Sequence, residues 1–294
     1  SQLAARTIGS LEITGLEART PDGFFANHAL VLKGIDFSIK GQDADTDDQP
    51  LAPPTIEAMR MEGFDFAAQG HSGSLALAEM SARYGSGPVP TAFRSTMRNL
   101  VVPIPSDQTD EGTKTLREMG IDRIDMSVDA EGLWNPNTRD YSLGGFTIRL
   151  TDMGAVSLSA NLGDVPPEVF LTDPVLATQA VLGATLKDIT LRVENAGLFE
   201  KFIAKVAREQ RMPEDRLRTS LGFQAAGLLT LLVKDQKLAV DAARAVNQFT
   251  NDPRAVVISA RPSSPVRFDD IMAGATADPG QLLESLGLQV RANP

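Results

Sequence analysis

Two short stretches, LKGIDF at residues 32–37 and MEGFDF at residues 61–66, share one arrangement of apolar and polar residues. Each has an apolar residue first, a glycine third, and apolar residues again at the fourth and sixth positions. From the fourth residue onward the alternation has a period of two, which is typical of a β-strand with one dry and one wet face. Such strands favour an antiparallel sheet.

The same unit returns in looser form at residues 121–126, 143–148 and 186–191, which read IDRIDM, LGGFTI and LKDITL. Five related units indicate a chain that is rich in short amphipathic strands. The apolar residues at the sixth positions are expected on buried faces of the sheet. They are Phe37, Phe66, Met126, Ile148 and Leu191.

Two of the units lead through a polar turn into a second strand, which predicts two β-hairpins. The first runs from residues 61–68 to 74–77, and the second from 143–150 to 155–158. The hairpins match in order and polarity with a slip of one residue. This match is consistent with an internal duplication and equally with the general similarity of amphipathic hairpins.

The pattern changes near residue 173, where apolar residues begin to recur at helical spacing. Amphipathic helices are predicted over 198–208, from Pro213 onward, and over 238–249, followed by a strand at 255–260 and short helices between 268 and 286. The expected fold is therefore α+β, with an extended, curved, mainly antiparallel sheet and helices from the C-terminal third on one face. Residues 1–172 form the β-rich region and 173–294 the helical segment, within one continuous domain.

Composition excludes several classes of function. The chain has a net charge of −10, a pI near 4.8, no cysteine and only 5% aromatic residues. An acidic protein repels phosphate backbones, so nucleic acid is not an expected partner. The absence of cysteine rules out disulfides, thiolate zinc sites and a cysteine nucleophile.

Catalytic motifs are incomplete wherever they occur. Residues 70–74, GHSGS, lack the final glycine of a nucleophile elbow and are expected to join two strands as a turn. His28 and His71 have no spacing that brings them together, so neither zinc nor any other cofactor is expected. The acidic loop at 43–48 lacks the glycine and glutamate of an EF-hand, and a solvated loop is favoured over a loose calcium site. Asp269 with Asp270 has no evident partner for glycoside hydrolysis. The protein is therefore not expected to be an enzyme.

The remaining features concern membranes. The chain starts at Ser1, so a signal peptide or membrane anchor is expected to precede it, and no run of residues reaches the length that spans a bilayer. Six basic residues outnumber three acidic ones between 201 and 218. They suit a solvated helix face, or contact with anionic lipid or an acidic partner.

The repeated strand units, the Trp134-Asn135-Pro136 turn before Tyr141, and the late amphipathic helices resemble Gram-negative envelope proteins of the AsmA-like and YdgA-like kind. The resemblance spans residues 32–193. It implies a periplasmic β-rich body, an inner-membrane anchor at the N-terminus and a role in the envelope that includes lipid handling.

Two main functions are thus expected. The first is a periplasmic protein that binds or carries lipid or another apolar ligand, and the alternative is a structural or protein-interaction module of the envelope without a small ligand. A hydrolase is the least favoured. The helical stripes are the candidate walls of a ligand groove, through five residues: Phe202, Val206, Leu221, Leu228 and Leu232.

Overall fold

A computed structural model describes residues 7–37, 55–68, 70–85, 87, 89–106, 110–170, 174–233 and 235–294. The chain divides into two compact units. Unit 1 is Ser1–Pro105 with Arg123–Trp134, and unit 2 is Ser106–Asp122 with Asn135–Pro294. The division falls after Trp134, whereas the change from strands to helices expected at residue 173 lies within unit 2.

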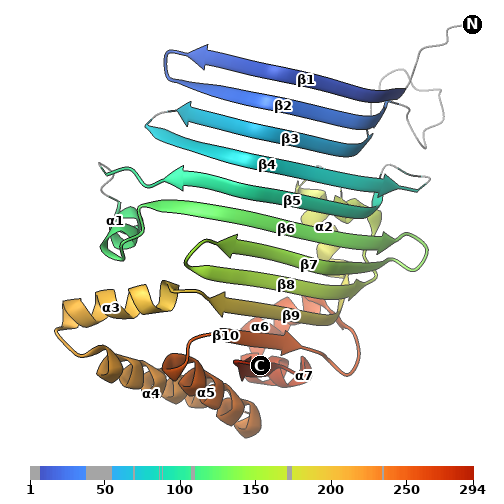
Figure 1. Ribbon diagram of the computed structural model, residues 1–294. Helices are drawn as coiled ribbons and strands as arrows, with labels where there is room; N and C mark the ends of the chain where they lie inside the picture. The colour runs from blue at the N-terminus through green and yellow to red at the C-terminus, as the bar shows by residue number, and fades with distance from the viewer. Residues whose placement is uncertain are drawn as a thin grey trace, which may run out of the picture. The chain divides into compact units, whose positions relative to one another are not determined.

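Unit 1 is an antiparallel sheet in which each strand pairs with the next one along the chain (Figure 1). Long strands joined by short connections explain this simple order, because consecutive strands meet as hairpins. The strands are β1 (Thr7–Thr20), β2 (Gly23–Asp36), β3 (Thr55–Ala68), β4 (His71–Tyr84), β5 (Pro90–Pro103) and β6 (Arg123–Asn135). No helix belongs to the described part of unit 1.

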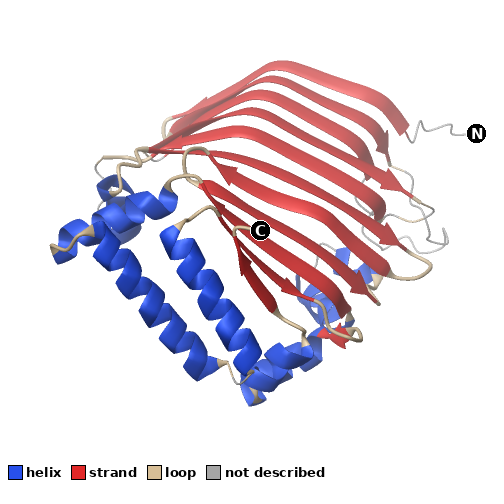
Figure 2. Cartoon of the chain, turned by 60° about the horizontal axis from the view of Figure 1, so that its bottom comes forward, coloured by secondary structure: helices blue, strands red, loops and turns tan. Residues whose placement is uncertain are grey.

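The strands of unit 1 bend near their middles (Figure 2). Three of the strands have a residue of positive φ near the middle: Gly15 at 65° on β1, Gly63 at 60° on β3 and Asn99 at 51° on β5. Glycine adopts this conformation without steric cost, and asparagine tolerates it better than most residues. Residues at this row interrupt the regular pairing, so the glycine of the MEGFDF unit marks a kink inside a strand and not its start.

Unit 2 also contains an antiparallel sheet, in the order β7, β8, β9, β10, β12, with β11 paired to β9. These strands are β7 (Asp140–Leu150), β8 (Gly154–Gly163), β9 (Thr185–Asn195), β10 (Ala255–Ala260), β11 (Val266–Arg267) and β12 (Gln289–Ala292). The register shifts between Leu143 and Phe146 on β7, within the LGGFTI unit, and again beside Leu186 on β9. Both units therefore place the repeated sequence pattern at irregular points of long strands.

Unit 2 carries the helices. They are α1 (Glu111–Glu118), the 3-10 helix η1 (Pro167–Phe170), α2 (Pro174–Gly183), α3 (Leu198–Gln210), α4 (Glu214–Leu232), α5 (Gln236–Asn251), α6 (Phe268–Ala277) and α7 (Pro279–Ser285). Capping explains several of their starts: the side chains of Asp110, Asp235 and Asp278 accept hydrogen bonds from backbone N–H groups in the first turns of α1, α5 and α7. None of the described helices is long and apolar enough to cross a membrane.

Two apolar clusters hold the helices of unit 2 in place. One forms around Leu186, Ala260 and Leu286, and it joins α6 and α7 to the strands. The other forms around Ile203, Ala207 and Leu217, and it joins α3 to α4. Ile203 is completely buried. Burial of this kind is the main stabilising term for amphipathic helices, whose intrinsic stability is small.

The expected α+β class, with a mainly antiparallel sheet, is confirmed, and both predicted hairpins occur, as β3–β4 and β7–β8. The prediction that Phe37 is buried is wrong, because β2 ends at Asp36 and the Phe37 side chain is exposed. The other four residues of that set are half-buried. The acidic segment 43–48 lies outside the described residues.

Candidate apolar binding face

One side of the unit 1 sheet is built from apolar side chains arranged in rows across the strands. The row next to the kink consists of Leu16, Asn27, Phe64, Leu75, Leu100 and Met126, each paired with the next. On the other side of the kink the row consists of Ile13, Leu30, Met61, Ala78, Met97 and Val128. Directly paired residues on neighbouring strands point to the same face.

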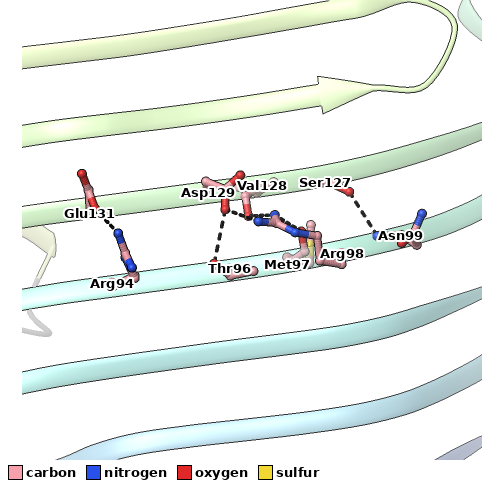
Figure 3. Close-up of polar contacts among 9 residues, drawn as sticks. All are labelled: Arg94, Thr96, Met97, Arg98, Asn99, Ser127, Val128, Asp129 and Glu131. Carbon is pink, nitrogen blue, oxygen red and sulfur yellow. Dashed lines mark hydrogen bonds and ion pairs between the residues drawn. The ribbon is translucent and has the colours of Figure 1, made fainter.

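Strand β6 shows that these two rows share a face. Met126 and Val128 lie two residues apart on a strand without a kink, so their side chains point the same way. Met126 pairs with Leu100 and Val128 pairs with Met97, three residues away on β5. The spacing of three is accommodated by the irregular pairing around Asn99, whose N–H donates to Ser127 Oγ at 3.2 Å (Figure 3). The kink thus keeps one continuous apolar face across a bent sheet.

We call this surface the apolar face. It also includes a third row, which lies farther from the kink and consists of Leu11, Leu32, Met59 and Met80. Phe25 and Phe66, which pair with each other, extend it at the opposite end. The rings of Phe25, Phe64 and Phe66 form a group, with centroids 6.2 Å apart between Phe25 and Phe64 and 6.0 Å between Phe64 and Phe66. Such separations are typical of favourable aromatic pairs.

The ring of Phe66 lies over Gly73, which has no side chain. A Cβ at Gly73 would lie 2.7 Å from Cζ of Phe66, its partner on β3. Phe66 therefore fills the space above Gly73, an arrangement that supports glycine positions in sheets. Any larger residue at position 73 would displace the ring from the apolar face.

Asn27 is the polar exception on the apolar face. Its side chain is only 5% exposed, and neither Nδ2 nor Oδ1 has a hydrogen-bond partner among the described residues. It sits in the row between Leu16 and Phe64. A buried amide without partners costs about 1–3 kcal/mol, so Asn27 lowers the stability of the folded state.

The opposite side of the sheet carries paired charges. Arg94 donates to Glu131 at 2.8 Å, Arg98 pairs with Asp129 at 2.5 Å, and Thr96 donates to Asp129 at 3.3 Å (Figure 3). The guanidinium of Arg98 also donates to the carbonyl oxygens of Met97 and Val128. These contacts join β5 to β6.

Arg60 extends the charged side across β3 and β4, where it pairs with Glu62 and Glu79. Its hydrogen bond to Glu62, helped by the attraction of both carboxylates, raises the pKa of the guanidinium above its ordinary value. A hollow of about 420 Å³ lies here, lined by charged residues such as Lys33, Arg60 and Glu79 and also by the apolar Val31, Met59 and Met80.

The predicted groove residues are in unit 2 and are divided between packing and solvent. Val206 and Leu221 pack on the cluster of Ile203, Ala207 and Leu217. Phe202 and Leu228 are 42% and 59% exposed. Leu232 ends α4, in a stretch whose side chains are not described. The hollows described in unit 2, of about 650 and 550 Å³, are lined by none of these residues and carry charged groups such as Arg244 and Arg192.

The sequence motifs that were considered for catalysis have structural roles. His71 begins β4, so residues 70–74 join two strands as expected. The His28 side chain lies against Gly63, within 2.4 Å of where a Cβ would be. Asp269 pairs with Arg267 at 2.7 Å, and the hydrogen bond from this arginine lowers the pKa of the carboxyl group. The described residues contain no group of three or more potential metal ligands.

The basic residues of α3 and α4 also make internal contacts. Lys205 pairs with Glu209 at 2.6 Å and with Glu118 at 3.2 Å. Arg208 donates to the carbonyl oxygen of Glu118 at 2.9 Å, and Arg218 lies 5.3 Å from the ring centre of Phe199. Three of the six cations thus hold helices of unit 2 together, which reduces the charge that they offer to lipid headgroups.

Sequence reasoning found Phe66 and Met126 on the apolar face but missed β1, β5 and Asn27. A signal was present, since Ile13 to Ala18 and Met97 to Val102 repeat the spacing of MEGFDF, with asparagine replacing the glycine in the second. Asn27 gives no signal of its own, because a single asparagine in a strand is indistinguishable from a solvent-facing one.

Comparison with known proteins gives a family without an assigned activity. The chain belongs to a family described only as "Uncharacterized protein", whose sequence profile matches residues 147–293. This match lies within unit 2 and does not reach the apolar face. Neither a curated protein nor a solved structure matches the chain.

Proposed function

We propose that the protein binds elongated apolar ligands, such as the acyl chains of lipids, along the apolar face of unit 1. The observation that carries the proposal is a continuous apolar surface on a six-stranded sheet that no helix of unit 1 covers. Leu11, Leu16 and Phe25 on this surface are 41%, 43% and 37% exposed. Contiguous exposed apolar surface on a folded protein marks a site for ligands, membranes or partners.

The apolar composition of the surface favours a hydrocarbon ligand over a compact polar substrate. Leucine, isoleucine, methionine and phenylalanine make up most of it, and methionine adapts its shape to different ligands. Ion pairs of unit 1, such as those of Arg60, Arg94 and Arg98, lie on the opposite side. A carrier needs only this burial of hydrocarbon, so the absence of an assembled catalytic constellation among the described residues fits the proposal.

The proposal includes the location that the family resemblance implied. A carrier of this kind would act in the periplasm of a Gram-negative cell, associated with the inner membrane through an N-terminal anchor. The helical stripes of unit 2, through Phe202 and Leu228, remain candidates for a second contact with ligand. The alternative role, a module that binds another envelope protein, is supported by the long exposed edge of β1.

Two neighbouring phenylalanines provide a matched test. Phe25 lies on the apolar face, whereas Phe24 pairs with Arg19 and Ala67 on the opposite side, and their exposed fractions are 37% and 42%. We expect Phe25→Glu to weaken binding of a fluorescent diacylglycerol at least tenfold, because a charge would be placed in the hydrocarbon site. Phe24→Glu should leave binding unchanged.

Far-ultraviolet circular dichroism would show that both variants keep their strands. Mass spectrometry of organic extracts from the purified protein would identify lipid that accompanies it. Equal binding by the two folded variants, or no binding of the diacylglycerol by the wild type, would exclude the apolar face as a lipid site.

A further inference from the structure

Strand β1 forms an edge of unit 1 that is unusually open. It has 14 residues, pairs with β2 on one side only, and has no partner among the described residues on the other side. Every residue of β1 except Ala18 is exposed. An edge strand of this length, at about 3.3 Å per residue, presents roughly 45 Å of unpaired backbone. Such an edge is a template for pairing with another strand.

Two of the usual features that prevent edge pairing, proline and lysine, are absent from β1, although the strand carries the exposed charges of Glu12, Glu17 and Arg19. Its apolar residues Ile8, Leu11, Ile13 and Leu16 are all exposed. Soluble proteins ordinarily block such edges with charges, prolines or very short strands. The exposed edge therefore has the properties of an interface.

The apolar pattern of β1 is symmetric. Leu11, Ile13, Leu16 and Ala18 point to the apolar face, and the shift of phase at Gly15 places them at equal distances on both sides of the midpoint between Thr14 and Gly15. A two-fold rotation about an axis through this midpoint therefore places apolar residues of one strand opposite apolar residues of the other. In an antiparallel pair of two β1 strands, Leu11 would lie opposite Ala18 and Ile13 opposite Leu16.

We propose that two copies of this chain associate through antiparallel pairing of their β1 strands about a two-fold axis between Thr14 and Gly15. The two unit 1 sheets then form one sheet, and their apolar faces become continuous. Kinks coincide in this register, since Gly15 of each strand lies beside Thr14 of the other. A two-fold axis makes the contact closed, as in most protein dimers.

The register also brings charged residues together on the opposite side. Glu12 lies opposite Glu17 of the partner subunit, and Ser10 lies opposite Arg19 of the partner subunit. Arg19 already donates to Glu17 of its own strand at 2.6 Å, and it would reach Glu12 diagonally. Each half of the interface thus has two carboxylates for one guanidinium.

A different pairing is less favourable. Strand β12, which ends the sheet of unit 2, has only four residues and would leave most of β1 unpaired in a head-to-tail contact. A peptide from an unrelated protein would also need the apolar pattern with its phase shift. The self-matching pattern of β1 favours a second copy of this chain.

Sedimentation of the full chain over a range of concentrations tests the proposal. We expect a monomer–dimer equilibrium in which Glu12→Lys lowers the dissociation constant several-fold. The two directly opposed Glu12–Glu17 pairs become attractive, and this outweighs the loss of the more distant diagonal contact with Arg19. Ile13→Asp should raise the dissociation constant at least tenfold. Leu133→Glu, on β6 at the other end of the strand order of unit 1 and 57% exposed in the present structure, should have no effect. A monomer at all concentrations, or a dimer that is insensitive to both β1 variants, would overturn the proposal.

Spin labels measure the register directly. The chain has no cysteine, so a single Ser10→Cys substitution carries the label. Ser10 and its counterpart are nine residues apart along the paired strands, which gives a separation on the order of 30 Å. A label at Thr14→Cys should lie within about 10 Å of its counterpart. Any dimer with the two distances reversed, or with both beyond 40 Å, would contradict pairing through β1.

Discussion

From the positive φ of Gly15 we expect two glycines of β1, Gly15 and Gly9, to differ sharply in their tolerance of alanine. Gly15 has φ of 65° and Gly9 does not fall in the left-handed region, yet a Cβ at either position would meet no atom within 4 Å. Both lie on β1 and both are exposed. Substituting each with alanine therefore isolates the conformational effect from any steric contact.

The expected magnitudes follow from the backbone. The left-handed conformation costs a non-glycine residue about 1–2 kcal/mol. Replacing glycine by alanine also restricts the unfolded chain, which stabilises the native state by about 0.4–1 kcal/mol where the conformation is compatible. Gly15→Ala should therefore lower the free energy of unfolding by about 1 kcal/mol, whereas Gly9→Ala should leave it unchanged or raise it slightly.

Gly63 adds a contact to the conformational cost. Its φ is 60°, and a Cβ there would lie 2.4 Å from Nδ1 of His28. The imidazole must leave its preferred rotamer, which costs about 0.5–1.5 kcal/mol more. Gly63→Ala should therefore lower the free energy of unfolding by about 2 kcal/mol. In a His28→Ala background the same substitution should cost only about as much as Gly15→Ala.

Urea denaturation followed by circular dichroism measures these differences through the midpoint and the slope of the transition. An unchanged slope would show that the variants unfold to a similar state. The reasoning fails if Gly15→Ala is as harmless as Gly9→Ala, since φ would then not matter at the kink. It fails equally if removing His28 does not reduce the cost of Gly63→Ala.

Three further predictions concern single sites. Asn27→Leu should raise the free energy of unfolding by about 1–3 kcal/mol in urea denaturation, because it removes an unpaired buried amide; a loss of stability would show that the amide has a partner. Lys187 donates to Asp140 and lowers the pKa of its carboxyl group below 3.8, so this stabilisation is present above pH 3.8 and is lost as the pH falls through the folded value. Asp140→Asn should therefore lower the melting temperature modestly at pH 7 and not at pH 2; an equal loss at both values would refute the pairing. Leu217→Ala should destabilise unit 2 by about 2–5 kcal/mol, whereas the exposed Leu228 should tolerate alanine within about 0.5 kcal/mol, as thermal unfolding would show.

Prediction from the sequence succeeded where one local rule decides the structure. The helix over 198–208 appears as α3, and the helix over 238–249 lies within α5, because apolar spacing acts within a few residues. The hairpin at Gly70 appeared for the same reason. Strand boundaries were less accurate, since the alternation was judged to begin at the fourth residue of each unit, whereas β3 extends from Thr55 through the kink to Ala68.

The candidate site was less predictable because it depends on pairing between distant strands. Met61 and Met97 share a row only through β4, and no local pattern fixes that register. The stripes of α3 and α4 looked equally apolar, yet Val206 was used in packing and Leu228 was left exposed. Sequence periodicity identifies an apolar face but does not show which neighbour covers it.

The kink connects the repeated sequence unit to both proposals. Without the shift of phase, the apolar residues of β3 would change sides at Gly63, and Met61 and Phe64 would face opposite directions. The positive φ of Gly15, Gly63 and Asn99 keeps these residues on one face while the strands bend. The same shift makes the pattern of β1 symmetric about the point between Thr14 and Gly15. In a strand with uninterrupted alternation, two residues at equal distances from such a point would face opposite sides of the sheet. The kink at Gly15 places them on the same side. Gly15→Ala should consequently weaken dimer formation as well as folding, whereas Gly9→Ala should weaken neither.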